Sequence, residues 1–229
     1  MNGVRVRLRP GITVLLVPAA DTSPGPVDRA ADGSSGPVTG AADGSSGPVA
    51  GDRAGLEGLP PWRRAELLAG RAALRHLLAE VLPEARDATV AYADSGRPYL
   101  VGWPYVGISI AHDAGSVAAG VAVGHTVGVD VQHPADTVPD SLLHRCLRQH
   151  TDELARLPMR HRATELAWVW TVQEACVKAA GTGMAGQPWS IDVRPYAHHG
   201  RWGRYRWTSL REASDIPFSC AYAPLPGSR

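Results

Sequence analysis

The sequence has almost no net charge and only one lysine. Its 23 basic residues nearly balance 22 acidic ones, so the formal charge is +1. A chain this close to neutral has no bulk attraction for nucleic acid or for an anionic membrane, and we expect neither as a partner. Any anionic ligand must instead be bound by basic residues gathered at its site. Nearly all of the basic residues are arginines, since Lys178 is the one lysine of the chain.

Cysteine is also scarce. The three cysteines, Cys146, Cys176 and Cys220, are odd in number and widely spaced, with no CxxC pair. This spacing argues against a zinc site or a redox motif. We expect three reduced, buried thiols.

The sequence near the start has no apolar run long enough to span a membrane. Residues 12–17 are apolar and follow Arg5, Arg7 and Arg9, an order that a secretory signal peptide can also show. The alternation of apolar and basic residues over 4–9 is more typical of a strand. We therefore expect a cytoplasmic protein, with a signal peptide as the alternative.

Residues 21–58 lack the apolar pattern of a folded segment. They are rich in Gly, Pro, Ser, Ala and Asp, and the sequence Ala-Ala-Asp-Gly-Ser-Ser-Gly-Pro-Val occurs at 30–38 and again at 41–49. Such a segment cannot bury enough surface to offset its ordering entropy. Two copies are also too few for a solenoid. We expect a disordered insert inside a tolerant loop.

The remaining sequence predicts a mixture of helices and antiparallel strands. A helix is expected from Pro61 to about Leu82, with a basic edge formed by Arg64, Arg71 and Arg75 that taken alone indicates a solvated face. Further helices are expected over 141–149 and 160–180, and strands over 106–111, 117–123, 127–132, 189–194, 205–210 and 218–222. Short turns make the first three of these strands an antiparallel meander. The fold class is therefore α+β.

Two short patterns place chemical groups on shared faces. In the strand over 127–132, Asp130 and Gln132 lie on the face opposite the valines. In the helix over 160–180, Glu174 and Lys178 are four residues apart and share a face. Taken alone, these patterns indicate a solvent-facing aspartate and a surface salt bridge of small energetic value. Gly181 suits the end of the helix.

Taken together, the patterns resemble the phosphopantetheinyl transferase superfamily. Val-Gly-Val-Asp130-Val-Gln132 resembles G-[IV]-D-x-E, and Trp170-x-x-Gln173-Glu174-x-x-x-Lys178-x-x-Gly181 resembles W-x-x-K-E-[AS]-x-x-K-x-x-G. Upstream, Gly96-Arg97-Pro98 resembles G-[KR]-P, and Ser109-Ile110-Ala111-His112 resembles S-[IVL]-[ST]-H. Arg64 and Arg71 stand where the long, surfactin-type branch has arginines on an early helix. The four elements occur in the family's order between residues 63 and 183.

The resemblance implies transfer of 4′-phosphopantetheine from coenzyme A to a serine of an apo acyl or peptidyl carrier protein. Asp130, Glu174 and Gln132 would then be the ligands of Mg²⁺, with Glu174 also a base for the incoming serine. Lys178 would stabilise the phosphate oxygens or the departing 3′,5′-ADP.

The resemblance also assigns a coenzyme A site. His112 would bind a phosphate of coenzyme A. Arg71, with Arg64 and the Arg97-Pro98 element, would hold the 3′-phosphate and adenine end.

Two positions differ from the family pattern. Gln132 replaces a frequent glutamate, which predicts weaker metal binding. Gln173 replaces a lysine, which would remove a charge near the pyrophosphate. Because the two losses are of opposite sign, we interpret them as an adjustment of one site.

The surfactin-type resemblance implies a monomer of two similar α+β halves, residues 1–123 and 124–229. The active site would lie between them, with coenzyme A arginines from the first half and metal ligands from the second. One alternative is a non-catalytic module that binds coenzyme A or a carrier protein. Another is an unrelated metal-dependent phosphohydrolase. Release of 3′,5′-ADP only in the presence of a carrier would separate the three.

Overall fold

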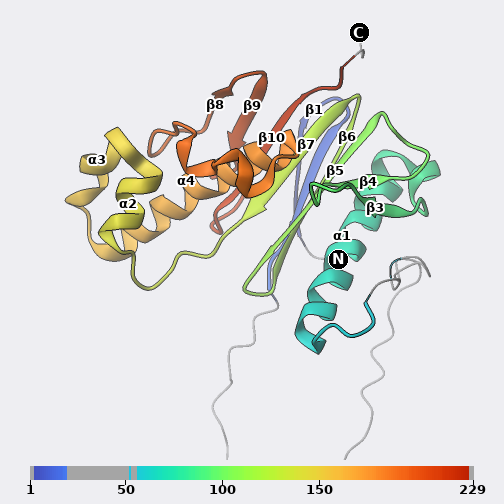
Figure 1. Cartoon of the computed structure of the whole chain (residues 1–229), viewed down its shortest axis with the longest axis horizontal. Helices are drawn as coiled ribbons and strands as arrows, with labels where there is room; N and C mark the ends of the chain where they lie inside the picture. Colours follow the sequence, from blue (N-terminus) through green and yellow to red (C-terminus); the bar gives the residue numbers. More distant parts are fainter. Residues whose placement is uncertain (1–2, 20–51, 53–55, 227–229) are drawn as a thin grey trace, which may run out of the picture.

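The computed structural model describes residues 3–19, 52 and 56–226. The repeat at residues 30–49 lies outside these residues. The described chain folds into helices and two antiparallel sheets, which confirms the predicted α+β class (Figure 1). It contains no helix that is long and apolar enough to cross a membrane.

The first sheet has six strands, in the order β1-β2-β6-β5-β4-β3. They are β1 (Val4–Arg9), β2 (Ile12–Val17), β3 (Val90–Tyr92), β4 (Pro98–Leu100), β5 (Val106–Asp113) and β6 (Ser116–Val123). Helix α1 (Pro61–Val81) packs on one face and is followed by the 3₁₀ turn η2 (Pro83–Ala85). Both the strand over residues 4–9 and the helix beginning at Pro61 are confirmed.

The second sheet has four strands, in the order β7-β10-β9-β8. They are β7 (His125–Val131), β8 (His199–Trp202), β9 (Tyr205–Ser209) and β10 (Phe218–Pro224). Helix α4 (Met159–Ala180) packs on this sheet, and α2 (Asp140–Leu147) and α3 (Thr151–Ala155) pack beside α4. The short 3₁₀ turns are η3 (Arg148–His150), η4 (Gly183–Gly186) and η5 (Pro188–Ser190).

The two sheets pack face to face between the helices. Val14 and Leu16 of β2 lie in one buried cluster with Val127 and Val129 of β7 and Phe218 of β10. The result is a layered order of α1, first sheet, second sheet and α4, which can be followed from right to left in Figure 1. The chain passes from the first sheet to the second between β6 and β7.

The predicted three-strand meander is wrong at its third strand. Strands β5 and β6 pair antiparallel as expected, but β7 pairs with β10. After Gly124, at φ +70°, β7 crosses over β5, where a Cβ on Gly107 would lie 2.3 Å from the His125 carbonyl oxygen. The Val129 amide donates a hydrogen bond of 3.0 Å to Ser109 Oγ, so that a serine hydroxyl joins the two strands.

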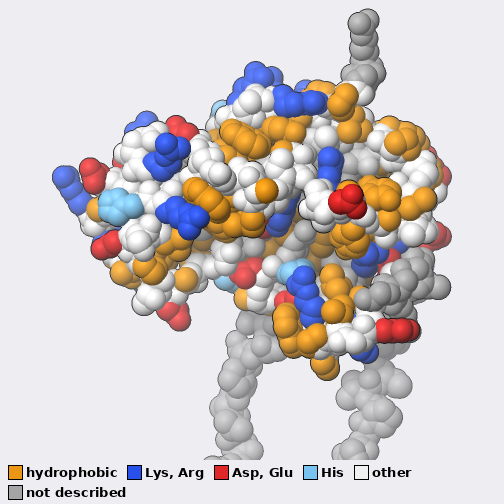
Figure 2. Space-filling view, viewed as in Figure 1, with side chains coloured by type: hydrophobic (Ala, Val, Ile, Leu, Met, Phe, Trp, Pro, Cys, Tyr) orange, Lys and Arg blue, Asp and Glu red, His pale blue; other side chains and the backbone are white. Residues whose placement is uncertain are grey.

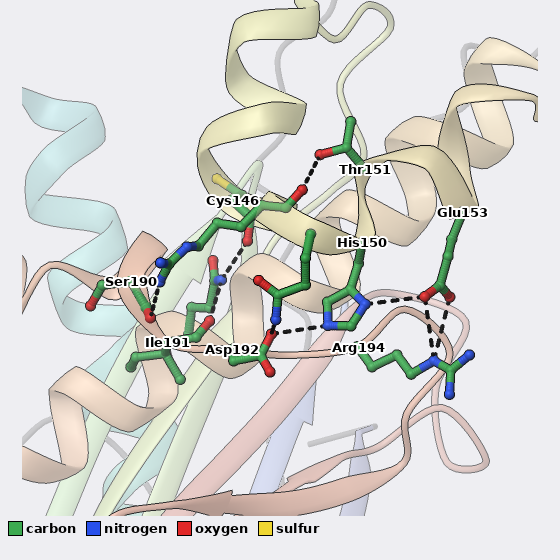
Figure 3. A network of polar contacts seen from close by, with 11 residues as sticks. Cys146, His150, Thr151, Glu153, Ser190, Ile191, Asp192 and Arg194 are labelled. Atoms are coloured by element: carbon green, nitrogen blue, oxygen red, sulfur yellow. Dashed lines mark hydrogen bonds and ion pairs between the residues drawn. The ribbon is translucent and has the colours of Figure 1, made fainter.

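The predicted strand over 189–194 is also wrong. Residues 188–190 form the turn η5, and the chain beyond it is irregular until β8 begins at His199. Ile191 and Val193 are buried and alternate with exposed residues, as they would in a strand. The segment nevertheless pairs with no described strand, because it covers the helices instead: the Ser190 carbonyl oxygen accepts from Arg148 of η3, as Figure 3 shows.

All three cysteines are free and buried, as predicted. Burial raises the pKa of Cys146 to about 11 and that of Cys176 to about 12. The pKa of Cys220 is raised in the same way.

Candidate functional site

The site begins where β7 packs directly on α4. A Cβ on Gly128 would lie 2.1 Å from the Ala175 carbonyl oxygen and 2.4 Å from the Ala179 nitrogen. Only glycine permits this approach. The next side chain on the same face of β7 is Asp130, which is thereby pressed against the last turns of α4.

Asp130 is paired with the single lysine of the chain. Lys178 Nζ donates to Asp130 Oδ1 at 2.5 Å, and Asp130 is 6% exposed. The aspartate is therefore not a solvent-facing strand residue. Nor does Lys178 form the surface salt bridge with Glu174 that their spacing alone would indicate, because it reaches across to the sheet.

The charges around Asp130 oppose one another. The pKa of Asp130 is raised to about 6, because burial and the charges of Glu174 and Asp113 raise it by more than the charge and hydrogen bond of Lys178 lower it. Two further carboxyl groups thus act on Asp130, which is paired with a single ammonium group. An added cation would relieve that repulsion.

Glu174 is half-buried and makes no hydrogen bond or ion pair with any described residue. Its position one turn before Lys178 places it on the same face of α4. An unpartnered carboxylate here can bind a cation or accept a proton.

Gln132 lies beside a carboxylate that sequence reasoning missed. Its Nε2 donates to Asp113 Oδ2 at 3.2 Å and to the His133 carbonyl oxygen at 3.3 Å. Asp113 follows directly after His112 at the end of β5. That adjacency to a family motif is the signal by which it could have been found.

The residues present fit a magnesium ion. Asp130, Glu174 and Gln132 offer oxygen atoms, which Mg²⁺ prefers, and Mg²⁺ usually takes one or two protein carboxylates with water and substrate phosphates. Within the described part of the chain, no three His, Cys, Asp or Glu side chains converge on one metal position. The donor set therefore suits an ion shared with a substrate better than a closed protein site.

Two adjoining cavities lead away from Lys178. The first, of about 130 Å³, is lined by residues that include Arg97, Lys178 and Gly181. The second, of about 180 Å³, is lined by residues that include Arg71 and His112. Their linings share Gly96, Pro98 and Ile110. The predicted lysine, histidine and two of the three predicted arginines therefore border one continuous depression.

Arg97 joins the two halves of the molecule at this depression. Gly181 ends α4 in the left-handed conformation, at φ +73°, and a Cβ there would lie 2.9 Å from Cδ of Arg97. Glycine is thus required both for the helix end and for the passage of the arginine. This gives the glycine of the helix motif a direct role in shaping the cavity.

Arg71 and Arg75 share a buried carboxylate. Arg75 is 2% exposed and donates to Asp52 through Nη2 at 2.7 Å and Nε at 3.0 Å. Arg71 Nη1 donates to Asp52 Oδ1 at 3.1 Å, and Arg71 Nη2 to the Tyr92 hydroxyl at 3.3 Å. The solvated face that this edge of α1 would indicate if taken alone is therefore not found at these two arginines, although Arg64 is exposed.

Asp52 also corrects the predicted extent of the disordered insert. Asp52 and Leu56 are both buried, although they fall within residues 21–58. Burial alone would raise the pKa of Asp52, but the hydrogen bonds and charges of Arg75 and Arg71 outweigh it and hold the pKa below its ordinary value. No apolar periodicity marks a single aspartate in a Gly/Ala-rich segment, so sequence reasoning had no signal by which to find it.

His112 is in contact with Arg63. Arg63 Nη1 lies 3.0 Å from His112 Nε2, and Glu66 Oε2 accepts from the same Nη1 at 3.1 Å. Arg64 donates instead to the Leu59 carbonyl oxygen at 3.4 Å and does not line the cavity of Arg71. The structure thus brings Arg63, which was not predicted, to the position expected of Arg64.

Gln173 lies in the interior rather than in the site. It is fully buried, and its Nε2 donates to the carbonyl oxygens of Cys146 and Ile191, each at 2.9 Å. These acceptors belong to the network drawn in Figure 3. The interpretation that Gln173 removes a charge near a pyrophosphate is therefore wrong, and the residue links α4 to α2 and to the irregular segment.

The molecular surface in Figure 2 shows no continuous basic face. Basic, acidic and apolar side chains are interspersed across this view, as expected for a nearly neutral chain. Positive charge is thus concentrated at particular positions, of which Arg71, Arg97 and Lys178 border the two cavities.

Comparisons with known proteins match the part of the chain that contains these residues. Residues 126–220 match the sequence profile of the 4′-phosphopantetheinyl transferase superfamily. The L-aminoadipate-semialdehyde dehydrogenase-phosphopantetheinyl transferase of Eremothecium gossypii is 34% identical over 132 residues, which are 54% of this chain and 48% of the relative. The chain therefore spans about half the length of this curated relative. The profile match includes Asp130, Glu174 and Lys178.

Proposed function

Because residues 126–220 match the profile of the 4′-phosphopantetheinyl transferase superfamily, we propose that the chain transfers 4′-phosphopantetheine from coenzyme A to a serine of an apo acyl or peptidyl carrier protein. The other product is 3′,5′-ADP. The observation that carries the proposal is the ion pair of Asp130 with Lys178, one helical turn after the unpartnered Glu174, where Lys178 lines a depression that continues to Arg71.

Lys178 would act on the phosphates of coenzyme A. Asp130 holds its ammonium group at 2.5 Å, and the group lines the first cavity. A positioned cation of this kind stabilises charge that develops on phosphate oxygens as the bond to 3′,5′-ADP breaks. Since Asp130 already fixes the ammonium group, little reorganisation accompanies the reaction.

Glu174 would accept the proton of the incoming serine, directly or through a water molecule. It has no partner among the described residues and lies on the face of α4 that carries Lys178. The nucleophilic hydroxyl belongs to the carrier protein, so that no serine of this chain is needed for the transfer. A positioned general base of this kind contributes ~10² to 10⁴ in rate.

Asp130, Glu174 and Gln132 would hold a magnesium ion. When bound, the ion would neutralise charge on the pyrophosphate. Asp130 is suited to this because it is buried among like charges, and Gln132 is suited because its amide nitrogen is occupied elsewhere.

The far end of the depression would hold the 3′-phosphate and adenine. Arg71 lies there with two of its donor atoms already oriented by Asp52 and Tyr92. His112, Arg97 and Pro98 line the path between Arg71 and Lys178. Arg64 would contribute less, because it is exposed and directed to Leu59. We further propose that the two halves act together as a cytoplasmic monomer.

The proposal is tested by incubating the protein with coenzyme A, Mg²⁺ and a panel of apo carrier proteins. The expected result is a phosphopantetheine mass increase on one or more carriers, together with release of 3′,5′-ADP that depends on the carrier. Tight binding of coenzyme A without any transfer would favour the non-catalytic module. Release of 3′,5′-ADP in the absence of a carrier would favour a hydrolase.

A further inference from the structure

The amide group of Gln132 has one orientation that its surroundings allow. Both groups that face its Nε2, the Asp113 carboxylate and the His133 carbonyl, are hydrogen-bond acceptors. The reverse orientation would place the amide oxygen against two other oxygens. Gln132 Oε1 therefore points away from both groups.

We infer that Asp113 is a positioning residue that turns the oxygen of Gln132 toward the magnesium ion. The inference rests on the proposed function and assigns to it a residue that no family motif contains. In this role Asp113 does not bind the metal. It occupies the nitrogen side of the amide, so that the neutral side chain at position 132 presents an oxygen, as the family's usual glutamate would.

Asp113 is itself held in place from several sides. Its Oδ2 also accepts from the His133 backbone nitrogen at 2.5 Å and lies 3.1 Å from His133 Nδ1. The other ring nitrogen lies 3.4 Å from Ser116 Oγ, which in turn accepts from the Ala19 nitrogen at 3.0 Å. In a neutral ring, Nδ1 donates to Asp113 and Nε2 accepts from the serine hydroxyl. The carboxylate therefore has little freedom to leave Gln132.

This arrangement makes position 132 unsuited to a carboxylate. A glutamate there has no hydrogen to donate, and it would meet the Asp113 carboxylate where the amide now lies 3.2 Å from it. Both side chains are only partly exposed, so solvent would not fully screen the repulsion. Gln132→Glu, which restores the common family residue, should thus impair the site for as long as residue 113 is an aspartate.

The test is a double-mutant cycle read by metal binding. Mn²⁺, which takes oxygen ligands as Mg²⁺ does, is titrated in the presence of coenzyme A and followed by electron paramagnetic resonance, in the wild type, Gln132→Glu, Asp113→Asn and the double variant. Gln132→Glu should weaken Mn²⁺ binding about 10-fold in the Asp113 background, the lower end of the range for residues that orient ligands. In the Asp113→Asn background the same substitution should not weaken binding. The Mg²⁺ concentration for half-maximal turnover should follow the same order.

Gln149 provides a matched control away from the site. Its Nε2 donates to Asp192 at 2.8 Å on an exposed surface, and Asp192 is labelled in Figure 3. Gln149→Glu therefore creates the same juxtaposition of carboxylates and should leave Mn²⁺ binding unchanged. Thermal unfolding checks that every variant is folded. If Gln132→Glu does not fold, Asp113→Ala, which frees the amide to rotate, must still weaken Mn²⁺ binding.

The outcomes separate the inference from the function on which it rests. Tighter Mn²⁺ binding by Gln132→Glu, or an equal change in both backgrounds, would overturn the role of Asp113 and leave the transferase proposal intact. A wild-type protein that binds no Mn²⁺ with coenzyme A would overturn the metal site and the role of Asp113 together.

Discussion

The two helix-on-sheet halves of the molecule have opposite imbalances of charge at the proposed site. In the α1 half, Arg71 and Arg75 share the one carboxylate of Asp52. In the α4 half, the one ammonium group of Lys178 faces Asp130, whose pKa is also affected by the charges of two other carboxyl groups. The first imbalance favours an anion and the second a cation. A phosphate ligand that brings a divalent cation would complete both.

The largest effect is expected from removing the unpartnered carboxylate of the α4 half. Glu174→Gln keeps the shape of the side chain but loses its charge and its ability to accept a proton, so turnover should fall ~10² to 10⁴-fold. Carrier modification followed by mass spectrometry measures the loss. Thermal stability should stay close to that of the wild type, because no described contact is lost. Recovery of wild-type turnover at high Mg²⁺ would show that Glu174 is a ligand only.

The α1 half should respond to loss of its carboxylate by unfolding more easily. Asp52→Ala leaves two buried guanidinium groups without their partner, and breaking a buried pair in this way costs about 3–5 kcal/mol. Chemical denaturation measures the loss. Glu80→Gln is the control, because Glu80 pairs with Arg5 on the surface and should change stability by less than about 1 kcal/mol. An equal effect of both variants would remove Asp52 from this role.

The effect of Asp52 should also depend on pH. Since its pKa is held below the ordinary value in the folded chain, the stabilisation it gives is complete above the unfolded-state pKa. It is lost as the pH falls through the folded-state pKa. The difference between wild type and Asp52→Ala should therefore be full at neutral pH and shrink in acid. A difference that grows in acid would contradict the assigned direction.

The preference of the α1 half for an anion is tested by comparing two substrates. Arg71→Ala should raise the Michaelis constant for coenzyme A roughly 10-fold or more, as expected for a lost charge-assisted hydrogen bond. It should change the constant for dephospho-coenzyme A much less, because only coenzyme A has a 3′-phosphate. Arg64→Ala, at an exposed position of the same helix, should have the smaller effect. Equal effects of Arg71→Ala on both substrates would place the phosphate elsewhere.

The smallest effect is expected from removing the repeat that precedes α1. Replacing residues 21–50 with a short Gly/Ser link should leave turnover nearly unchanged, since loop length has little influence on closure entropy. A deletion extended to residue 55 also removes Asp52 and should destabilise the protein as Asp52→Ala does. If the shorter deletion alone abolishes transfer, the repeat contributes to function.

The sequence predicted the two long helices well, but not every strand and not which strands pair. Short turns predict that β7 follows β6 in one sheet, yet the missing Cβ of Gly107 and the hydroxyl of Ser109 let β7 cross over β5. Residues 189–194 show the alternate burial that their sequence pattern predicts. They nevertheless pair with no described strand. Periodicity reports which side chains are buried and not what covers them.

The motifs predicted some of the residues that the structure brings together, but not all of them. Asp130 and Lys178 were expected to act together, and the structure places them in contact. Asp52 and Asp113 were missed because their importance arises from partners that lie 19 and 20 residues away in the chain, Arg71 and His133. Gln173 was misjudged for the opposite reason, because a motif position was assumed to face the site.

The three buried cysteines have a consequence for the proposed function, whose substrate carries a thiol. Both coenzyme A and the phosphopantetheine arm end in a sulfhydryl group, and disulfide exchange begins with attack by a thiolate. With a pKa of about 11, Cys146 is ionised in only about one molecule in 10⁴ at neutral pH, and the other two thiols are shifted in the same direction. The interior is therefore protected from mixed disulfides with the proposed substrate, and oxidised coenzyme A should not label the folded chain.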